Sequence, residues 1–249
     1  MRNIRLTIDY LGRNYLGWQR QSKGPTVQGE LEKALTILLR EPVLVNGVSR
    51  TDAGVNARGF TVNFKTGSAV TLDHMMGGLN GLLPSDITVV DAAEVPEAWH
   101  ARKSAVWREY EYLIWNKPHP DIFRRQTVWH CPKPLDVEAM RAGAAVLVGR
   151  HDFRAFCVAS SAPKGCVRTV ETLSLDTPEP GLIRMTIRAD GFVHKMVRSI
   201  AGTLIDIGLG RLEPAVVADM VRTGDRELAG KTAPGHGLTL VRIGYDEES

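Results

Sequence analysis

Hydrophobic and polar residues alternate along this chain with two different periods. Ile4, Leu6 and Ile8 alternate with polar residues, which is the pattern of a strand with one buried face. Thr26 precedes apolar positions at helical spacing, so a helix capped by Thr26 is predicted. Further strands are expected at 62–64, 87–90, 104–115, 182–187 and 238–245, and further helices at 73–82, 137–147 after the cap Asp136, 194–208, and from Pro214 onward.

Strands and helices occur in both halves of the chain without the regular crossovers of a parallel sheet. We therefore predict an α+β fold with a mainly antiparallel sheet spanning two similar halves, helices packed on one side and a basic cleft between the halves. The seam is expected near residue 104, which gives an N-terminal half, 1–104, and a C-terminal half, 105–249. Clefts tend to form at such seams, so the second half is expected to complete a site begun by the first.

Composition restricts the class of protein. The 249 residues are 43% hydrophobic and 24% charged, which is ordinary for a globular chain and excludes disorder. No apolar run approaches the roughly 18 to 20 residues of a membrane span, and the N-terminus lacks the apolar core of a signal peptide. A cytoplasmic protein without membrane contact is expected. The cysteines lack a Cys-x-x-Cys pair and are interpreted as reduced and structural; they are Cys131, Cys157 and Cys166.

The distribution of charge says more than the net charge of +3. Arg102 and Arg108 alternate with aromatic residues that include Trp107 and Tyr110. Guanidinium groups beside aromatic rings suit a ligand with phosphates and flat bases. The same pattern is also typical of a solvated strand face over core aromatics, so this segment alone leaves both interpretations open.

Several common chemistries have no support in the sequence. There is no glycine-rich phosphate loop ending in Gly-Lys-Ser/Thr and no Gly-x-Ser-x-Gly elbow for a serine nucleophile. The seven histidines show neither a His-x-x-x-His nor a His-Glu-x-x-His spacing. Nucleotide hydrolysis, serine hydrolysis and a metal site are therefore not indicated.

One loop stands out, GVSRTDAGVNARG at residues 47–59, because it sets a single carboxylate, Asp52, between two arginines. Ala53 and Gly54 are small enough to let a bulky ligand approach the backbone. An aspartate in this position can serve as a nucleophile or base. It can equally close a turn by bonding its own backbone, and the loop alone does not decide between these roles.

The segment RTDAGV, residues 50–55, resembles the catalytic signature of the tRNA pseudouridine synthase A family. Asn56 stands where that family often has histidine, and Lys103 where an apolar or aromatic residue is common, which concerns fine substrate contacts. Several ordered blocks are far more specific than one loop and favour the functional interpretation of Asp52. The blocks similar to the family are GWQRQ (17–21), TVQGELE (26–32), HAR (100–102), REYEY (108–112), GRHDF (149–153), GF (191–192), MVR (196–198), GTL (202–204) and APGHGL (233–238).

The resemblance implies an isomerase that converts uridine to pseudouridine in the anticodon stem-loop of tRNA, at tRNA positions 38–40. It also implies that no cofactor or metal takes part. Family members act as homodimers with the tRNA lying across both subunits, so a homodimer bound to tRNA is expected.

Roles for individual residues follow from the same resemblance. Asp52 is the expected nucleophile, kept ionised by Arg198, because a close arginine lowers the pKa of a carboxyl that burial would raise. Tyr110 is expected to lie against the extruded uracil and to accept or relay its C5 proton. Arg50 would fill the space left by the nucleotide or hold its phosphate, and Leu240 would pack under the base.

Other cations are candidates for phosphate contacts, and each is equally typical of a solvated surface. These residues are Arg20, Lys23, Arg58, Arg102 and Arg108.

Two other functions stay open at this point. A non-catalytic tRNA-binding protein would use the same basic and aromatic surface, yet it would gain nothing from a carboxylate aimed at a polyanion. Metal-assisted hydrolysis would need Asp52 together with Asp152 or His151, and the scattered ligands argue against it.

Overall fold

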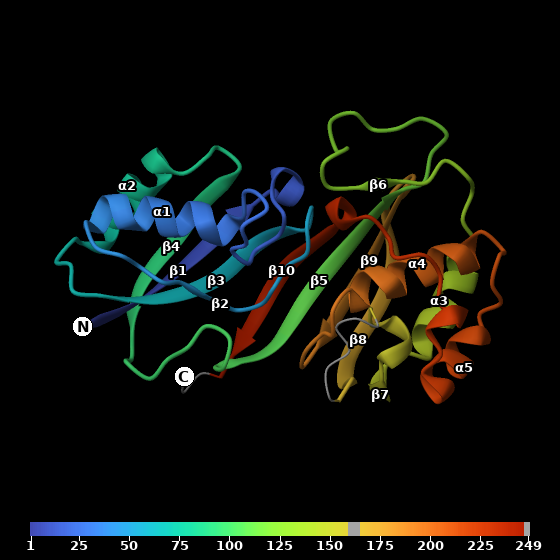
Figure 1. The fold of residues 1–249 in the computed structure, drawn as a ribbon. Coiled ribbons are helices and arrows are strands. Elements are labelled where there is room, and N and C mark those ends of the chain that lie inside the picture. Colours follow the sequence, from blue (N-terminus) through green and yellow to red (C-terminus); the bar gives the residue numbers. More distant parts are fainter. Residues whose placement is uncertain (159–164, 247–249) are drawn as a thin grey trace. The chain divides into compact units, whose positions relative to one another are not determined.

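The chain folds into two compact units. The computed structural model describes residues 1–158 and 165–246 (Figure 1). The first unit is Met1–Val106 together with the chain from Thr239 on, and the second is Trp107–Leu238. Among the helices that the model describes, none has the length and apolar character required to span a bilayer.

The first unit is built on a sheet in the order β4-β1-β3-β10. Strand β1 pairs antiparallel with both β3 and β4, and β10 lies parallel to β3 through Thr239 and Leu240 opposite Asn56 and Ala57. The strands are β1 (Arg2–Tyr10), β3 (Asn56–Thr66), β4 (Ile87–Val95) and β10 (Leu238–Tyr245), with the short β2 (Asn46–Gly47) pairing with β3.

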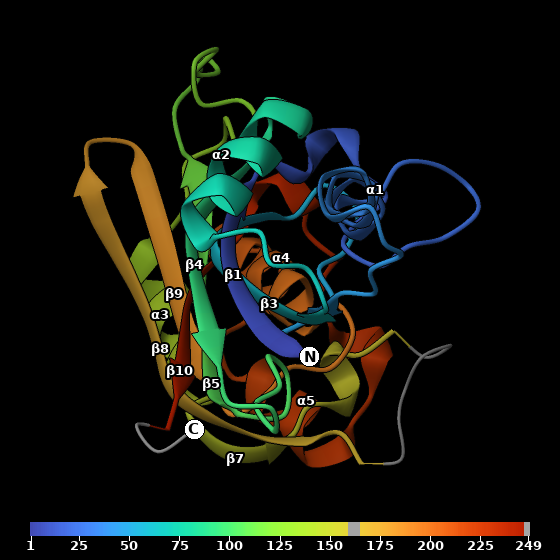
Figure 2. The same cartoon turned by 90° about the vertical axis from the view of Figure 1, so that its left-hand side faces the viewer.

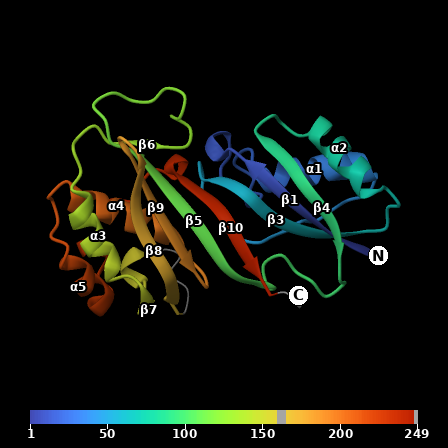
Figure 3. The ribbon, with the colours of Figure 1, turned by 180° about the vertical axis from the view of Figure 1, so that it is seen from behind.

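Two helices cover one face of the first unit's sheet, and Figure 3 shows the opposite face of the same strands. They are α1 (Val27–Leu39) and α2 (Leu72–Leu82). The hydroxyl of Thr26 accepts the backbone N–H of Gly29 at 3.2 Å, so the predicted cap of α1 is confirmed. Leu31 and Leu35 of α1 are fully buried, as are the alternating apolar residues of β1. The buried face of the helix and the buried face of the strand, which the two sequence periods indicate, therefore belong to one core.

The second unit has an antiparallel sheet in the order β5-β9-β8-β7. Figure 2 shows β8 and β9 as a long hairpin. The strands are β5 (Ala105–Trp115), β7 (Gly149–Asp152), β8 (Val167–Glu179) and β9 (Leu182–Ala189), and β6 (Trp129–His130) runs parallel to β5.

Three helices pack on one side of the second unit's sheet (Figures 1 and 3). They are α3 (Val137–Ala145), α4 (Met196–Gly208) and α5 (Val216–Thr223). Asp136 accepts the N–H of Ala139 at 3.0 Å and caps α3 as predicted. Short 3-10 turns complete the unit at Arg154–Phe156, Arg226–Leu228 and Gly235–Gly237, and Gly12–Asn14 forms such a turn in the first unit.

The predicted fold class is confirmed, because both units combine helices with a mainly antiparallel sheet. Several details differ from the sequence interpretation. Strands β2, β6, β7 and β8 were not predicted, α4 begins at Met196 rather than His194, and α5 begins at Val216 rather than Pro214. The final strand, which the sequence assigns to the second half, joins the first unit through its pairing with β3. The basic cleft stays a prediction.

Candidate functional site

The loop that carries Asp52 connects β2 to β3 in the first unit and closes with a tight turn. The N–H of Val55 donates to the carbonyl of Asp52 at 3.1 Å, and Gly54 has a φ of +78°. A positive φ at the third position is the mark of a type II turn and suits glycine. The turn is thus closed by a backbone carbonyl that any residue at position 52 would supply. The carboxyl group of Asp52, on a half-buried residue, is not required to close it.

Thr51 is held by the N-terminal segment of the same unit. Its carbonyl accepts the N–H of Trp18 at 3.1 Å, and its hydroxyl lies 2.8 Å from the hydroxyl of Tyr10. Gly17 makes this approach possible, since its φ is +97° and a Cβ there would lie 2.5 Å from the Thr51 carbonyl oxygen. Backbone contact therefore fixes the residue that precedes Asp52.

The other side of the loop is fixed in the same way. The side-chain oxygen of the buried Asn56 accepts the N–H of Gly12 at 2.9 Å. A Cβ at Gly12 would lie 2.1 Å from the carbonyl oxygen of Val55, so only glycine fits there. From the sequence Asn56 is a departure from a family pattern, and its structural role was not predicted. Nor were Tyr10, Gly12 and Gly17 predicted as supports of the loop.

Leu240 lies on β10, opposite Ala57 in the strand that follows the loop, and is fully buried. Arg50 is exposed two residues before Asp52. Arg50 therefore lies in the Asp52 loop itself, and Leu240 lies on the strand that pairs with β3, within the same unit.

The remaining cations of the first unit have different surroundings. Lys23 and Arg58 are exposed, and the described residues include no acid paired with either of them. Arg20 differs, because its Nη1 lies 3.1 Å from the carboxylate of the buried Glu32. Lys23 and Arg58 are thus the better placed of these three to meet phosphates.

Arg102 is exposed, and its backbone N–H donates to Nδ1 of His100 at 3.1 Å. Burial lowers the pKa of His100, and nearby Lys103 lowers it further. A neutral imidazole has a nitrogen that can accept this bond, so the lowered pKa and the hydrogen bond agree.

The second unit carries Arg198, Tyr110 and Arg108. Arg198 lies in the first turn of α4, and its Nε donates to the carbonyl of Ala233 at 2.8 Å. The buried ring of Tyr110 on β5 meets Phe192 edge-on, with centroids 5.0 Å apart. Arg108, two residues earlier on the strand, donates to the carbonyl of Asp190 at 3.3 Å.

Tyr110 and Arg198 are connected through the short segment that leads into α4. Phe192 touches Tyr110 and stands four residues before Met196, the first residue of the helix. The predicted residues therefore form two groups, one in each unit. The pairing of Asp52 with Arg198 stays a prediction.

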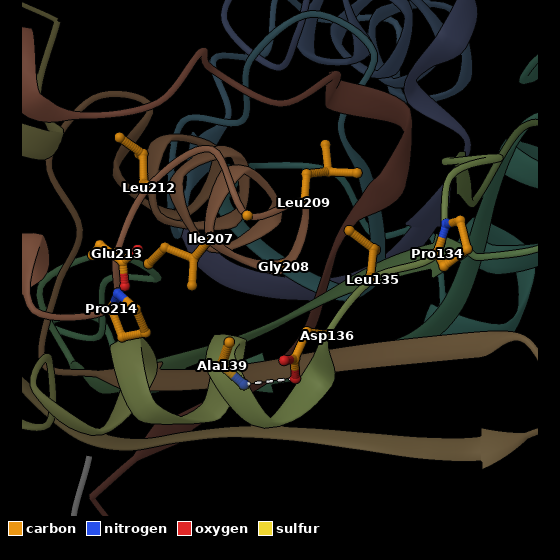
Figure 4. Close-up of a pocket in the computed structure, with 11 residues that line it drawn as sticks. Pro134, Leu135, Asp136, Ala139, Ile207, Gly208, Leu209, Leu212, Glu213 and Pro214 are labelled. Carbon is orange, nitrogen blue, oxygen red and sulfur yellow. Dashed lines mark hydrogen bonds between the residues drawn. The ribbon is translucent and has the colours of Figure 1, made fainter.

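A pocket of about 470 Å³ lies elsewhere in the second unit, between the start of α3 and the end of α4 (Figure 4). Its charged lining residues are Asp136 and Glu213, and no lysine or arginine lines it. None of the predicted site residues borders this pocket, and two acids without a cation do not suit a polyanion.

Residues 1–158 and 165–246 were also searched for side chains that could bind a metal ion together. No group of three or more His, Cys, Asp or Glu side chains there is placed to hold a metal ion. Asp152 instead pairs with Arg154 at 3.2 Å, and a ring nitrogen of His151 lies 3.0 Å from the carbonyl of Val148.

Comparison with known proteins gives one family. A family model described as tRNA pseudouridine synthase matches residues 144–246. A solved structure described as the archaeal box H/ACA sRNP Nop10-Cbf5 complex aligns with 97% of this chain and 50% of that chain, at 12% identity and a TM-score of 0.41. That likeness is too weak to support an inference.

Curated relatives match the chain along nearly its whole length. It is 40% identical to "tRNA pseudouridine synthase A 2" of Clostridium perfringens, over 98% of this chain and 100% of that protein. It is 43% identical to "tRNA pseudouridine synthase A" of Ruminiclostridium cellulolyticum, with the same coverage of both chains. The protein of that name from Bacillus subtilis is 42% identical over 98% of this chain and 99% of its own length. The chain therefore belongs to the tRNA pseudouridine synthase A family and is an RNA pseudouridine synthase, an isomerase.

Proposed function

We propose that this enzyme isomerises uridine to pseudouridine in the anticodon stem-loop of tRNA, at positions 38–40, with Asp52 as the nucleophile. The observation that carries the proposal is the clamped loop. Thr51 and Asn56 are bonded to the N-terminal segment on either side of Asp52, and the turn closes through the backbone. A short carboxylate on a fixed backbone is pre-organised for attack on a bound nucleoside.

The chemistry exchanges one bond for another. The N-glycosidic bond between uracil N1 and ribose C1′ breaks, the uracil turns, and its C5 bonds to C1′. The C5 proton is then lost and N1 is protonated, so the product has the same composition as the substrate. Asp52 attacks the sugar or the uracil ring, or stabilises positive charge that develops at C1′.

The base must leave its stack before Asp52 can reach it, and extrusion costs a few kcal/mol. We propose that Tyr110 packs against the extruded uracil and accepts or relays its C5 proton, while Leu240 packs beneath it. The ring of Tyr110 is held edge-on by Phe192, which supports a fixed stacking surface. Arg50, exposed and near Asp52 in the chain, would take the vacated space or the phosphate.

Arg198 is proposed as the counter-charge of Asp52. A carboxyl in a dry pocket has a raised pKa, and a neighbouring guanidinium opposes that shift. The tRNA backbone would contact Lys23, Arg58, Arg102 and Arg108, with a smaller share for Arg20 because of its pairing with Glu32.

Tritium release from tRNA labelled at uridine C5 tests the assignment of Asp52. Asp52→Asn keeps the shape of the side chain and removes its charge, so we expect it to fold and bind tRNA but to release no tritium above background. Asp91→Asn is the matched control, because Asp91 is an exposed acid of the same unit paired with Arg5 at 2.9 Å. The control should release tritium at the rate of the unchanged enzyme.

The site in tRNA is tested by the same assay on transcripts whose uridines at positions 38–40 are replaced by cytidine. These transcripts should release no tritium. Substantial release by Asp52→Asn would defeat the nucleophile, and release from the altered transcripts would move the target elsewhere. Tight tRNA binding with no release by the unchanged enzyme would indicate a binding protein without this activity.

A further inference from the structure

Residues 230–234 lie along helix α4 in a continuous set of contacts, and we call this segment the clasp. The N–H of Gly230 donates to Thr203 Oγ1 at 3.0 Å, and the N–H of Ala233 donates to the Arg198 carbonyl at 3.0 Å. Positions along the clasp increase as positions along α4 decrease. The clasp therefore runs antiparallel to α4 for more than one turn, and its last contact with α4 is the one between Ala233 and Arg198.

Gly202 allows this close approach. A Cβ at position 202 would lie 1.7 Å from the carbonyl oxygen of Lys231, a distance that no side chain tolerates. Glycine inside a helix is less stable than alanine, so its presence in the middle of α4 needs a reason. Contact between two backbones supplies that reason.

The clasp bonds Arg198 twice. The Ala233 carbonyl accepts from Nε of Arg198 at 2.8 Å, while the Ala233 N–H donates to the Arg198 carbonyl at 3.0 Å. Arginine has many rotamers in solution, and a bond through Nε fixes the plane of its guanidinium. The bond also leaves the two Nη groups to other partners.

The clasp continues to strand β5. The hydroxyl of Tyr112 donates to the Pro234 carbonyl at 2.9 Å, and the ring of Tyr112 occupies the space beside Gly237. Burial raises the pKa of Tyr112, so its hydroxyl stays protonated and remains a donor. Tyr112 lies two residues from Tyr110 and on the same face of β5. The clasp thus links the helix of Arg198 to the strand of Tyr110.

An arginine from outside α4 supports the middle of the clasp. Arg226 donates from Nη2 to Thr232 Oγ1 and from Nη1 to the Ala155 carbonyl, both at 3.1 Å. A half-buried cation is costly to desolvate, and these bonds offset part of that cost. The clasp is therefore fixed from both sides.

We propose that Gly202 and Thr203 are positioning residues for the isomerisation, which act by holding the clasp against α4 so that the clasp orients the Arg198 guanidinium. The inference rests on the proposed function, because Arg198 must matter to the reaction for its orientation to matter. Neither Gly202 nor Thr203 would touch the tRNA. Their effect would appear in the rate of the bound complex rather than in tRNA affinity.

A double-mutant cycle tests this inference. We compare single-turnover tritium release by the unchanged enzyme, Gly202→Ala, Arg198→Lys and the double variant. A guanidinium displaced by about 1 Å costs on the order of 100-fold in rate, so Gly202→Ala should lose about that much while tRNA affinity changes less than about twofold. In the Arg198→Lys background the same change should cost less than about threefold, because the oriented group is already absent.

Gly208→Ala is the matched control on the same helix. A Cβ there would lie 2.8 Å from Sδ and 2.9 Å from Cγ of Met140 and 3.1 Å from Leu135, all side-chain atoms away from the clasp, so its rate should stay within about threefold of the unchanged enzyme. Thr203→Val removes the acceptor of Gly230 without a backbone clash and repeats the cycle if Gly202→Ala does not fold. Thr203→Ser should restore the rate.

The outcomes of the double-mutant cycle distinguish the positioning role from the proposed function. A 100-fold loss that is equally large with and without Arg198 would overturn the positioning role, as would a full rate in folded Gly202→Ala. Arg198→Lys at full rate would remove the proposed role of Arg198, and an inactive unchanged enzyme would remove the proposed function itself. A loss confined to the Arg198 background, with Gly208→Ala unaffected, supports the inference.

Discussion

The Asp52 loop and the Arg198 helix present their charged groups by different means, although both depend on glycine. At Gly17 the backbone of the N-terminal segment meets the Thr51 carbonyl, and at Gly202 the clasp meets α4. In both places a Cβ would fall within 2.5 Å of a carbonyl oxygen. Two segments distant in sequence are thus held by direct backbone contact.

The difference lies in what must be fixed. An aspartate has a short side chain, so fixing the backbone on both sides of Asp52 also fixes its carboxylate within a small volume. An arginine on a regular helix has a fixed backbone and a mobile side chain. It needs a further bond to the side chain itself, which Ala233 provides at Nε of Arg198. A short charged side chain can thus be positioned by its own loop, whereas a long one needs contact with a second segment.

The largest effect is expected from Gly17→Ala, which disrupts the close contact between the backbone at position 17 and the Thr51 carbonyl. The change combines strain at a φ of +97° with a clash of 2.5 Å against Thr51. Strain of about 1–2 kcal/mol and overpacking of about 1–3 kcal/mol should together lower the free energy of unfolding, as measured in urea. Tritium release should fall at least about 100-fold.

Gly59→Ala is the control for this change, because it introduces backbone strain of the same kind without a clash against Thr51. Gly59 has a φ of +74°, and a Cβ there would meet nothing within 4 Å. It should lose about 1–2 kcal/mol of stability and little activity. Equal losses of activity at the two positions would show that the contact with Thr51 does not hold the loop.

A smaller effect is expected from Tyr10→Phe, which removes the hydroxyl 2.8 Å from that of Thr51. One net hydrogen bond is worth about 1 kcal/mol, and the release rate should fall several-fold because Thr51 adjoins Asp52. Tyr15→Phe is the control, since the hydroxyl it loses bonds Asp86 and not a residue of the Asp52 loop. Its stability should fall while its release rate is retained; a fall in rate equal to that of Tyr10→Phe would contradict the role of Thr51.

The smallest effect concerns the cations around the loop. Arg58 is exposed, and the described part of the chain offers it no acid, whereas Arg20 lies 3.1 Å from the Glu32 carboxylate. Each phosphate contact contributes about 0.9 to the slope of log affinity against log salt. Arg58→Ala should lower that slope by about this amount and Arg20→Ala by less. Identical slopes in titrations of tRNA from low to moderate salt would refute the distinction.

Local signals in the sequence predicted much of the fold. Thr26 and Asp136 cap the helices that were expected, because a side-chain oxygen before an amphipathic run acts on neighbours only three residues away. The last strand runs from Leu238 to Tyr245 as predicted. These features depend on short stretches of chain, which a sequence pattern can show.

The missed elements depend on less regular burial. Strand β8 pairs with β9 but has register shifts after Val170 and Asp176, and most of its residues are at least partly exposed. Such a strand lacks a clean alternation. Helix α4 begins after Lys195, whose φ of +62° is uncommon outside glycine and leaves no sequence signal.

The residues that hold the candidate site in place could not be predicted from the sequence. Gly12, Gly17 and Gly202 matter because of carbonyl oxygens contributed by other segments, and no local pattern encodes such a distance. Asp52 stands out in the sequence of its loop, whereas its role as nucleophile and the choice of Arg198 were proposed from a family resemblance. What holds them became visible only when tertiary contacts were known.

Strand β10 has a consequence for the order in which the protein is made. Its residues Thr239 and Leu240 complete the sheet of the first unit beside β3, yet the ribosome synthesises them after all of the second unit. The nascent chain therefore leaves Asn56 and Ala57 of β3 without their β10 partners while more than a hundred intervening residues emerge, although β2 already covers Val62 and Asn63. An unpaired strand edge can pair with other chains, so this short stretch of β3 is exposed to such pairing until the last strand is made.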